Sequence, residues 1–355
     1  FEKSMRDTEG KYGGLGMVIT MKDNRLFVVK IMDDSPAKEA GIQSEDSFLR
    51  VNGKEVKGLD IQELADLLRG YPETQVTLTL YRSSEKKEYT HTLTRRIILV
   101  NTVEYESLEN HIGYFKISSF SKLTEKQLKK YLKQAKLEGV TGFILDLRGN
   151  PGGLLNQSVK VASHFLFKGR MVVYTQGRSE DDYREYRSLY KDSLYKMPVV
   201  VLINQYSASA SEIVAGALRD SGNALLIGEN SYGKGSVQTI FRVSDGSGVR
   251  LTTSKYYTPA GADITKNGIS PEIDIINDLI KEEAFTVKRK SSSTGTHLSL
   301  KASSLKKFFE KQGFKINKTL DATVELARRI LKNSHTASKK RSMEKAREIA
   351  ASINY

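Results

Sequence analysis

The sequence contains no cysteine among its 355 residues. This absence excludes disulfide bonds, zinc sites built on thiolates and a cysteine nucleophile. It fits an oxidising or a reducing compartment equally well, so it does not locate the protein. Any nucleophile must therefore come from another residue type.

Long apolar segments are also absent. No run approaches the roughly 18 residues that a membrane-spanning helix needs, and no signal peptide stands at the start. The chain begins with Phe1 rather than with Met. We therefore expect a fragment, in which a removed targeting segment would be invisible.

Histidine is scarce, and none of the five histidines lies in a motif suited to a general base. His91 falls in an alternating, strand-like segment and His164 on a predicted helix, so both are expected to be structural. The sequence has no Gly-x-Ser-x-Gly elbow and no His-Glu-x-x-His zinc pair. A Ser-His-Asp triad is poorly supported, and a serine nucleophile would need another base.

Positive charge is concentrated at the C-terminal end. The formal net charge is +14, and residues 281–355 hold 18 Lys and Arg against 7 Asp and Glu. Such a tail can contact nucleic acid or an anionic membrane surface. Because no nucleic-acid motif accompanies it, we expect no nucleic-acid partner and favour a solvated helical face. Contact with a membrane surface stays open.

The length predicts two or three domains, and 39% hydrophobic residues suffice for packed cores. Composition and pattern divide the chain into four parts, with no internal repeat. They are the polar stump of a preceding segment at 1–11, a β-rich module at 12–97, an α/β domain at 98–287 and a basic helical segment at 288–355. The α/β assignment rests on strands that alternate with helices.

Helices and turns are predicted from their end signals. In the first module, Pro36 begins a short helix, Asn52-Gly53 forms a hairpin turn and Asp60 caps a helix at 61–69. In the α/β domain, Thr124 is expected to cap a helix. The other main elements are strands at 142–147 and 199–203, helices at 154–167 and 211–221, a polar linker at 288–296 and amphipathic helices at 303–312, 319–332 and 337–352.

A glycine-rich loop opens the β-rich module. Tyr12-Gly13-Gly14-Leu15-Gly16 precedes a strand. Its glycines let successive backbone N–H groups converge on an anion such as a chain-terminal carboxylate. The following strand can pair with an extended peptide, and the helix at 61–69 would form the other wall of the groove. An ordinary β-turn is the alternative.

A run of small residues joins a buried strand to a helix. Ser207-Ala208-Ser209-Ala210-Ser211 follows the strand at 199–203 and leads into the helix at 211–221. A serine there lies near the positive end of a helix, where free N–H groups suit an oxyanion. Helix capping is an equally good explanation of serine at this place.

A lysine between two glycines supplies a possible base. Lys234 lies in Gly233-Lys234-Gly235, and Gln238 follows four residues later. Burial against the sheet would favour a neutral amine that can deprotonate a serine. If 234–238 is extended, Lys234 and Gln238 share a face, and Gln238 can hold the amine in place. A phosphate loop is disfavoured, because the upstream glycine and the following helix are missing.

A second glycine-rich turn lies between the strand at 142–147 and the helix at 154–167. In Asp146-Leu147-Arg148-Gly149-Asn150-Pro151-Gly152-Gly153, either Gly152 or Gly153 could donate an amide to an oxyanion beside the amide of Ala210. For Asp146 and Arg148 we favour structural pairing.

Together these motifs resemble the carboxyl-terminal processing proteases, also called tail-specific proteases. The matching segments are Asp146–Gly153, Ser207–Ile213, Gly233–Gln238 and 255–273, and the module in front resembles a PDZ domain. The resemblance implies a crotonase-like α/β layering, Ser209 as nucleophile, Lys234 as base and Gln238 as its assistant. It also implies an oxyanion hole from Ala210 and Gly152 or Gly153, and an extracytoplasmic, periplasmic location.

We accordingly expect a serine endopeptidase that needs no metal or cofactor and acts through a Ser-Lys dyad and an acyl-enzyme. The expected partners are proteins with a free C-terminus, bound by Gly13, Gly14, Leu15 and Gly16, with Arg82 as a further peptide-binding candidate. We also expect a homo-oligomer. A non-catalytic PDZ adaptor and an acyl-CoA-handling enzyme are the alternatives.

Overall fold

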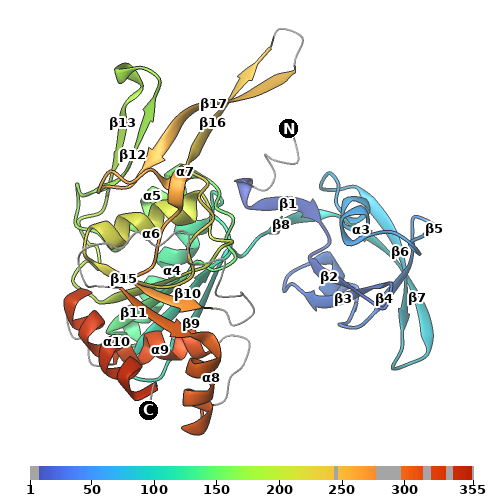
Figure 1. Ribbon diagram of the computed structural model, residues 1–355. Coiled ribbons are helices and arrows are strands. Elements are labelled where there is room, and N and C mark those ends of the chain that lie inside the picture. The colour runs from blue at the N-terminus through green and yellow to red at the C-terminus, as the bar shows by residue number, and fades with distance from the viewer. Residues whose placement is uncertain (1–7, 244–246, 277–296, 315–320, 333–338, 354–355) are drawn as a thin grey trace. The chain divides into compact units, whose positions relative to one another are not determined.

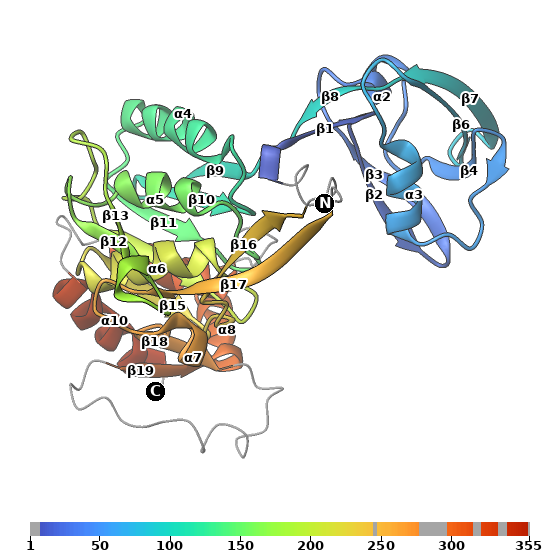
Figure 2. The same cartoon turned by 90° about the horizontal axis from the view of Figure 1, so that it is seen from above.

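The computed structural model describes residues 8–243, 247–276, 297–314, 321–332 and 339–353. It divides into two compact units, Phe1–Val100 and Asn101–Tyr355, which are drawn in Figures 1 and 2. The linker predicted at 288–296 and most of the predicted stump lie outside the described residues.

The first unit is β-rich. Its main sheet has the strand order β2-β3-β4-β6-β7, with β5 added to β4, and β1 pairs separately with β8. The bounds are β1 Lys11–Gly14, β2 Met17–Lys22, β3 Arg25–Ile31, α2 Pro36–Glu39, β4 Ser47–Val51, β5 Lys54–Glu55, α3 Ile61–Leu68, β6 Gln75–Arg82, β7 Lys87–Thr94 and β8 Arg96–Leu99.

The end signals in this unit act as the sequence predicts. Pro36 is the first residue of α2. Asp60 caps α3, accepting from the Glu63 amide at 2.8 Å while the Glu63 carboxylate accepts from the Asp60 amide at 2.8 Å. This reciprocal pair fixes where the helix begins, so its apolar residue Leu64 faces the core.

The second unit is built on a seven-stranded sheet with the order β19-β18-β15-β14-β11-β10-β9. Only β9 is antiparallel to its neighbour. The strands are β9 Val103–Leu108, β10 Ile112–Ile117, β11 Gly142–Asp146, β14 Val199–Ile203, β15 Ala224–Gly228, β18 Ile273–Ile276 and β19 Leu298–Lys301. The helices are α4 Thr124–Leu137, α5 Leu155–Ser163, α6 Ala210–Asp220, α7 Ile264–Asn267, α8 Ala302–Lys311, α9 Ala322–Leu331 and α10 Lys339–Ile353.

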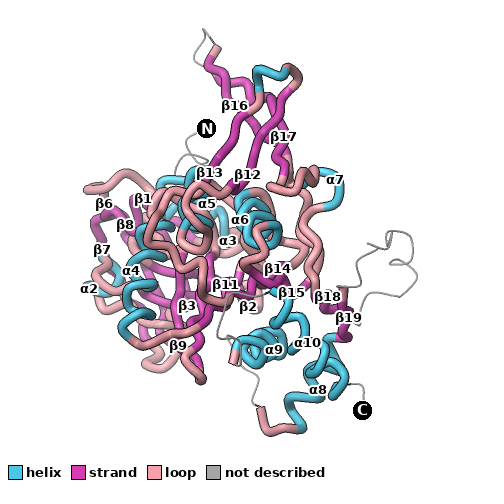
Figure 3. Tube along the Cα trace, turned by 90° about the vertical axis from the view of Figure 1, so that its left-hand side faces the viewer, coloured by secondary structure: helices cyan, strands magenta, loops and turns pink. Residues whose placement is uncertain are grey.

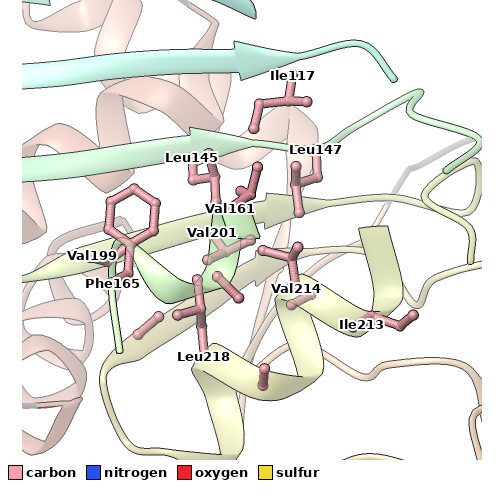
Figure 4. Close-up of a cluster of buried hydrophobic side chains, with 14 of the residues drawn as sticks. Ile117, Leu145, Leu147, Val161, Phe165, Val199, Val201, Ile213, Val214 and Leu218 are labelled. Carbon is pink, nitrogen blue, oxygen red and sulfur yellow. The ribbon is translucent and has the colours of Figure 1, made fainter. Parts of the chain in front are cut away.

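Both faces of this sheet are covered. Side chains alternate along each strand, so Val199 and Val201 join the core beneath α4, α5 and α6, whereas Val200 joins the core beneath α8, α9 and α10. Figure 4 shows Val201 with Val214 and Leu218 of α6 in the first core. The predicted α/β layering with a preceding β-rich unit is confirmed.

The C-terminal helices occur near their predicted places, and they are part of this packing. In Figure 3, α9 and α10 lie together beside the sheet. Their apolar residues Leu326, Ile330 and Ala346 are fully buried in the second core, and β19 extends the sheet next to β18. The basic segment is therefore amphipathic in structure, with one face packed on the sheet.

A further sheet projects from the second unit, as Figure 1 shows. Its order is β13-β12-β17-β16, with β12 Met171–Gly177, β13 Arg184–Arg187, β16 Ser236–Arg242 and β17 Gly248–Tyr257. Of this sheet, the sequence motifs indicate only an extended segment at 234–238, which overlaps the start of β16. The long ribbon of β16 and β17 begins at Ser236, two residues after Lys234.

Two predicted helix features are wrong. Thr124 does not cap α4: it is the first helical residue, and its buried hydroxyl bonds the Thr102 hydroxyl at 2.8 Å and accepts from the Ser121 amide at 2.9 Å. The helix expected at 154–167 is shorter, since α5 ends at Ser163.

Candidate active site

Ser209 stands directly before α6 in an unusual backbone conformation. Its φ is 54° and its ψ is −112°, a region that a residue with a side chain adopts only under constraint. Ser207 and Ser211 on either side are fully buried, and their hydroxyls donate to the carbonyls of Leu147 at 2.8 Å and Asn150 at 3.0 Å. The hydroxyls of Ser207 and Ser211 thus have structural partners, and the catalytic role of Ser209 stays a prediction.

A buried glutamate links Ser209 to Lys234. The Glu212 side chain lies at 0% exposure in the first turn of α6. Its Oε2 accepts from the Ser209 amide at 2.7 Å and from the Lys234 amide at 2.9 Å. Its Oε1 accepts from the Gly233 amide at 2.6 Å and from the Ser231 hydroxyl at 2.5 Å. One oxygen atom thus holds the two backbones on which the predicted dyad depends.

Lys234 lies in a tightly held turn. The carbonyl of Gly235 accepts from the Tyr256 amide at 2.7 Å, and a Cβ at Gly235 would stand 2.5 Å from the Thr265 nitrogen, so only glycine fits there. The Lys234 side chain itself is exposed. The expectation that it is buried against the sheet is therefore wrong for this state of the protein.

Gln238 is also exposed and lies on β16, which begins at Ser236. Lys234 precedes the strand, so strand alternation does not by itself place Lys234 and Gln238 on one face. In addition, the register with β17 shifts by one residue between Val237 and Gln238. The assisting role of Gln238 stays a prediction.

The loop with the paired glycines is fastened to the serine string by Asn150. This fully buried residue accepts through its carbonyl from the Ala208 amide at 3.0 Å. Its side-chain Nδ2 donates to the Ile117 carbonyl at 2.8 Å, and its Oδ1 accepts from the Gly152 amide at 2.8 Å. The backbones before Ser209 and before Gly152 are thereby held together.

Gly152 and Gly153 differ in the use of their amides. The Gly152 amide is already bonded to Asn150, whereas no described residue accepts from the Gly153 amide or from the Ala210 amide. A Cβ on Gly152, whose φ is 102°, would lie 2.8 Å from the Ser209 Cβ. Gly152 therefore supplies close packing, and Gly153 is the better placed of the two to donate to an oxyanion.

Asp146 and Arg148 are paired structurally, as the sequence favours. Arg148 binds the buried Asp146 through Nη2 at 2.6 Å and reaches Asp321 through Nη1 at 2.7 Å. The Tyr114 hydroxyl also donates to Asp146 at 2.8 Å. Burial, followed by the neighbouring Asp146 charge, raises the pKa of Tyr114 well above its usual range. This network connects the glycine-rich turn at residues 146–153 to Asp321, the N-cap residue of α9.

In the first unit, the loop Gly13–Gly16 leads into β2, which is an edge strand of the main sheet. The carbonyls of Leu15 and Gly16 accept from Ala37 and Met32, and no described residue accepts from the amides of Leu15 and Gly16. Helix α3 packs beside β2. These are the parts that an extended peptide with a terminal carboxylate requires.

Arg82, the further peptide-binding candidate, lies in a network of ion pairs at the end of β6. Its side chain is 10% exposed and binds Asp46 at 2.8 Å, with Glu85 at 3.2 Å and the Gly41 carbonyl at 3.0 Å. These bonds raise the pKa of Arg82 above its usual range. They fix the end of β6, and the peptide-binding role of Arg82 stays an untested prediction.

Sequence reasoning missed Glu212 and Asn150. Glu212 stands three residues after Ser209, the spacing of a capping box, and that signal could have been found. The role of Asn150 depends on contacts with residues far along the chain, so no local pattern reveals it. Among the described residues there is no cluster of acidic or histidine side chains able to hold a metal and no helix long and apolar enough to cross a membrane.

Known proteins match both units. The model of peptidase family S41 matches residues 111–275, and that of the PDZ domain matches residues 27–82. The "carboxy-terminal-processing protease" of Bartonella bacilliformis is 43% identical over 276 residues, covering 76% of this chain and 63% of its own length. The "probable CtpA-like serine protease" of Staphylococcus haemolyticus is 35% identical over 335 residues, covering 94% of this chain and 67% of its own length. The chain belongs to peptidase family S41.

The fold also resembles that of solved structures. One described as an S41 protease from Bacteroides fragilis shares 18% identity and a TM-score of 0.50, over 74% of this chain and 75% of that chain. It supports the fold alone. The chain spans between 53% and 67% of the length of the curated relatives that it matches. The predicted family and its PDZ domain are confirmed.

Proposed function

We propose that this S41 chain is a serine endopeptidase that processes the C-terminal tails of proteins, with Ser209 as nucleophile and Lys234 as general base. The observation that carries the proposal is the Glu212 carboxylate, which binds the amides of both residues through one oxygen. A non-catalytic PDZ adaptor would have no need to hold the backbones of Ser209 and Lys234 together.

In the proposed reaction, the neutral amine of Lys234 takes the Ser209 hydroxyl proton as Oγ attacks the substrate carbonyl. The amides of Ala210 and Gly153 stabilise the anionic intermediate. The resulting ammonium of Lys234 gives its proton to the leaving amine as the peptide bond breaks, and an acyl-enzyme remains. Water, deprotonated in turn by Lys234, then hydrolyses the ester.

The exposure of Lys234 sets a condition on this reaction. An amine in water is mainly an ammonium ion at neutral pH and a poor base. A substrate lying over Lys234 would exclude water, and desolvation favours the neutral amine. We therefore infer that substrate binding completes the base, with Gln238 orienting the amine.

The PDZ domain would present the substrate. Amides of the Gly13–Gly16 loop would hold the terminal carboxylate while the preceding residues pair with β2. We further propose an extracytoplasmic location, in keeping with the processing role named for the relatives.

The proposal is tested by incubating the chain with an unfolded protein that has a free, apolar C-terminus. We expect cleavage by the wild type and none above background by Ser209→Ala, whose thermal unfolding should be unchanged. Ser207→Ala and Ser211→Ala are the matched variants, and they should lose stability because their hydroxyls are buried donors. Substantial turnover by Ser209→Ala would remove Ser209 as the nucleophile.

A further inference from the structure

Helix α4 carries a row of lysines on its outer side, and Figure 2 shows this helix at the outside of the second unit. The buried side of the helix contributes Leu128, Leu132 and Ala135 to the first core. At 3.6 residues per turn, four residues lie opposite to that side, and all four are exposed. These residues, called the outer row below, are Lys126, Lys130, Lys133 and Leu137.

The lysines of α4 have no carboxylate partner among the residues that the structure describes. The helix contains three lysines in the outer row and two beside it. The acidic residues near its ends are bound elsewhere, since Glu125 binds His164 at 3.0 Å and Glu138 accepts from the Gln134 amide group at 2.8 Å. The positive charge of the helix therefore faces solvent.

Acidic residues of the neighbouring strand face the other way. Helix α4 packs beside β9, where Val103 and Tyr105 belong to the core beneath the helix. Glu104 and Glu106 alternate with them along the strand, so they lie on the opposite face of the sheet. They do not offset the lysines of α4.

The charge of α4 is a local cost to the fold. Lys126 and Lys130 are four residues apart, and so are Lys129 and Lys133. Like charges at this spacing destabilise a helix. No contact among the described residues offsets that cost, and a local cost without a structural return is expected where a surface has a function.

The basic C-terminal helices differ in this respect. On α9, Arg328 binds Glu325 at 2.7 Å, and on α10, Lys345 binds Glu348 at 2.6 Å. Part of their positive charge is thus balanced within the fold. An anionic partner is therefore better matched by α4 than by the C-terminal segment.

We propose that the outer row of α4 binds the surface of a lipid bilayer that contains anionic lipids. Lysines are attracted to such a surface by its charge alone. Leu137, which is 90% exposed, would enter the headgroup region at the end of the row. The apolar side of α4 stays in the core, so the helix lies on the surface and does not insert. This inference does not depend on the proposed peptidase activity.

A bilayer fits the outer row better than a nucleic acid or an acidic protein does. The row extends over about 16 Å. Lysine is a flexible point charge, whereas arginine forms bidentate bonds to phosphate, and α4 contains no arginine. Single-stranded nucleic acid is held by aromatic side chains on which its bases stack, and a protein partner by central apolar anchors. The outer row has no aromatic residue, and Leu137 is its one apolar residue.

Vesicle sedimentation of the whole chain tests the partner. The chain should bind vesicles of phosphatidylcholine mixed with phosphatidylglycerol and should not bind vesicles of phosphatidylcholine alone, and added salt should weaken the binding. Equal binding to both kinds of vesicle, or binding to neither, would overturn the inference. Binding to inorganic polyphosphate without binding to the anionic vesicles would also overturn it, since the partner would then be a soluble polyanion.

A triple variant tests the surface. Lys126→Gln, Lys130→Gln and Lys133→Gln together should weaken binding to the anionic vesicles about tenfold to a hundredfold, because each lysine near such a surface contributes about fivefold. The variant should melt no lower than the wild type, since it loses like-charge pairs. A loss of binding could then not be ascribed to unfolding.

The matched control removes the same number of charges from α8. Lys306, Lys307 and Lys311 are also exposed, and their combined replacement by glutamine should weaken vesicle binding by less than about threefold, because charges away from the contact are screened by salt. Equal losses in the two triple variants would show that the net charge of the chain attracts it to the vesicles. The outer row of α4 would then be excluded as the binding surface.

Discussion

The importance of Glu212 lies in the combination of the hydrogen bonds that its carboxylate accepts, and no single one of them explains it. A carboxylate with two oxygen atoms meets four donors, from Ser209, Ser231, Gly233 and Lys234. Two of these donors belong to the turn that carries the proposed base, and one belongs to the proposed nucleophile. A buried acceptor that satisfies so many donors fixes their positions, because each one left unpaired would cost free energy.

Glu212→Gln should therefore damage catalysis more than it damages the fold. The amide keeps one acceptor oxygen, so at least one pair of donors loses its partner, and the turn at Lys234 shifts against Ser209. We expect kcat to fall about tenfold to a hundredfold with KM little changed. Steady-state kinetics with a short peptide measures this.

Glu325→Gln is the matched control for that substitution. Glu325 is also a fully buried glutamate, and it binds Arg328 at 2.7 Å and Arg329 at 2.6 Å on α9. Its replacement should lower the melting temperature and leave kcat of the folded enzyme nearly unchanged. A similar loss of kcat in both variants would show that Glu212 acts through stability alone.

Lys234→Arg should be nearly inactive although it keeps the positive charge. A guanidinium stays protonated in proteins and cannot accept the serine proton. Because the wild-type reaction requires the neutral amine, its rate should rise with pH, and the Arg variant should show no such rise. A pH series of kcat/KM checks both points; an active Arg variant would mean that Lys234 serves binding or structure.

At the scale of elements, the C-terminal segment contacts the glycine-rich turn at residues 146–153. Asp321 accepts from the amides of Thr323 and Val324 at 2.8 and 2.9 Å, which begins α9, and it also binds Arg148. Arg148 lies one residue before Gly149, whose amide is held by Asn204 at 2.9 Å. A change at the start of α9 can therefore reach the loop that carries Gly152 and Gly153.

Asp321→Asn separates the two roles of this side chain. Asparagine is as good a helix cap as aspartate, so α9 should persist, but the ion pair with Arg148 is lost. Because Asp321 is 35% exposed, we expect a stability loss of no more than about 1 kcal/mol. Peptide turnover should fall a few fold.

Glu109→Gln is the control for Asp321→Asn, since it breaks another ion pair of α9, with Arg328 at 3.1 Å, at an 84% exposed site. We expect it to change neither stability nor turnover. If Asp321→Asn likewise left turnover unchanged, the link between α9 and the glycine loop would have no catalytic consequence.

The sequence predicts a helix, strand or turn well when the interactions that form it lie between neighbouring residues. The α3 cap, the Asn52-Gly53 turn between β4 and β5, and the buried strand β14 depend on local sequence, and each is predicted. The start of α4 is misassigned because Thr124 is engaged by Thr102, more than twenty residues away.

The β16–β17 ribbon and the exposure of Lys234 also escape prediction. Both depend on packing between segments that are far apart in the sequence. The residues on either side of Lys234 carry no information about that packing. The resemblance to a family identifies the motifs at the candidate site, whereas the contacts that join them, through Glu212 and Asn150, need coordinates.

At the scale of the whole molecule, the proposed binding and hydrolysis belong to different units. The amides of Leu15 and Gly16 lie in the first unit, and Ser209 and Lys234 lie in the second. If the first unit acts by holding the tail, its contribution belongs to substrate binding and should leave the chemical step unaltered. A substrate too short to reach both sites should gain nothing from it.

Removal of the terminal charge should therefore act selectively. For a long peptide, amidation of the C-terminus removes the anion that the Gly13–Gly16 loop would bind, and we expect KM to rise about tenfold with kcat unchanged. A short reporter should be cleaved equally well with either end. Calorimetry on the same chain carrying Ser209→Ala, with the same two long peptides, should show the matching loss of affinity. Equal affinities for the free and amidated ends would mean that the loop does not read the carboxylate, and the tail-specific part of the proposal would fail while the Ser-Lys chemistry stood.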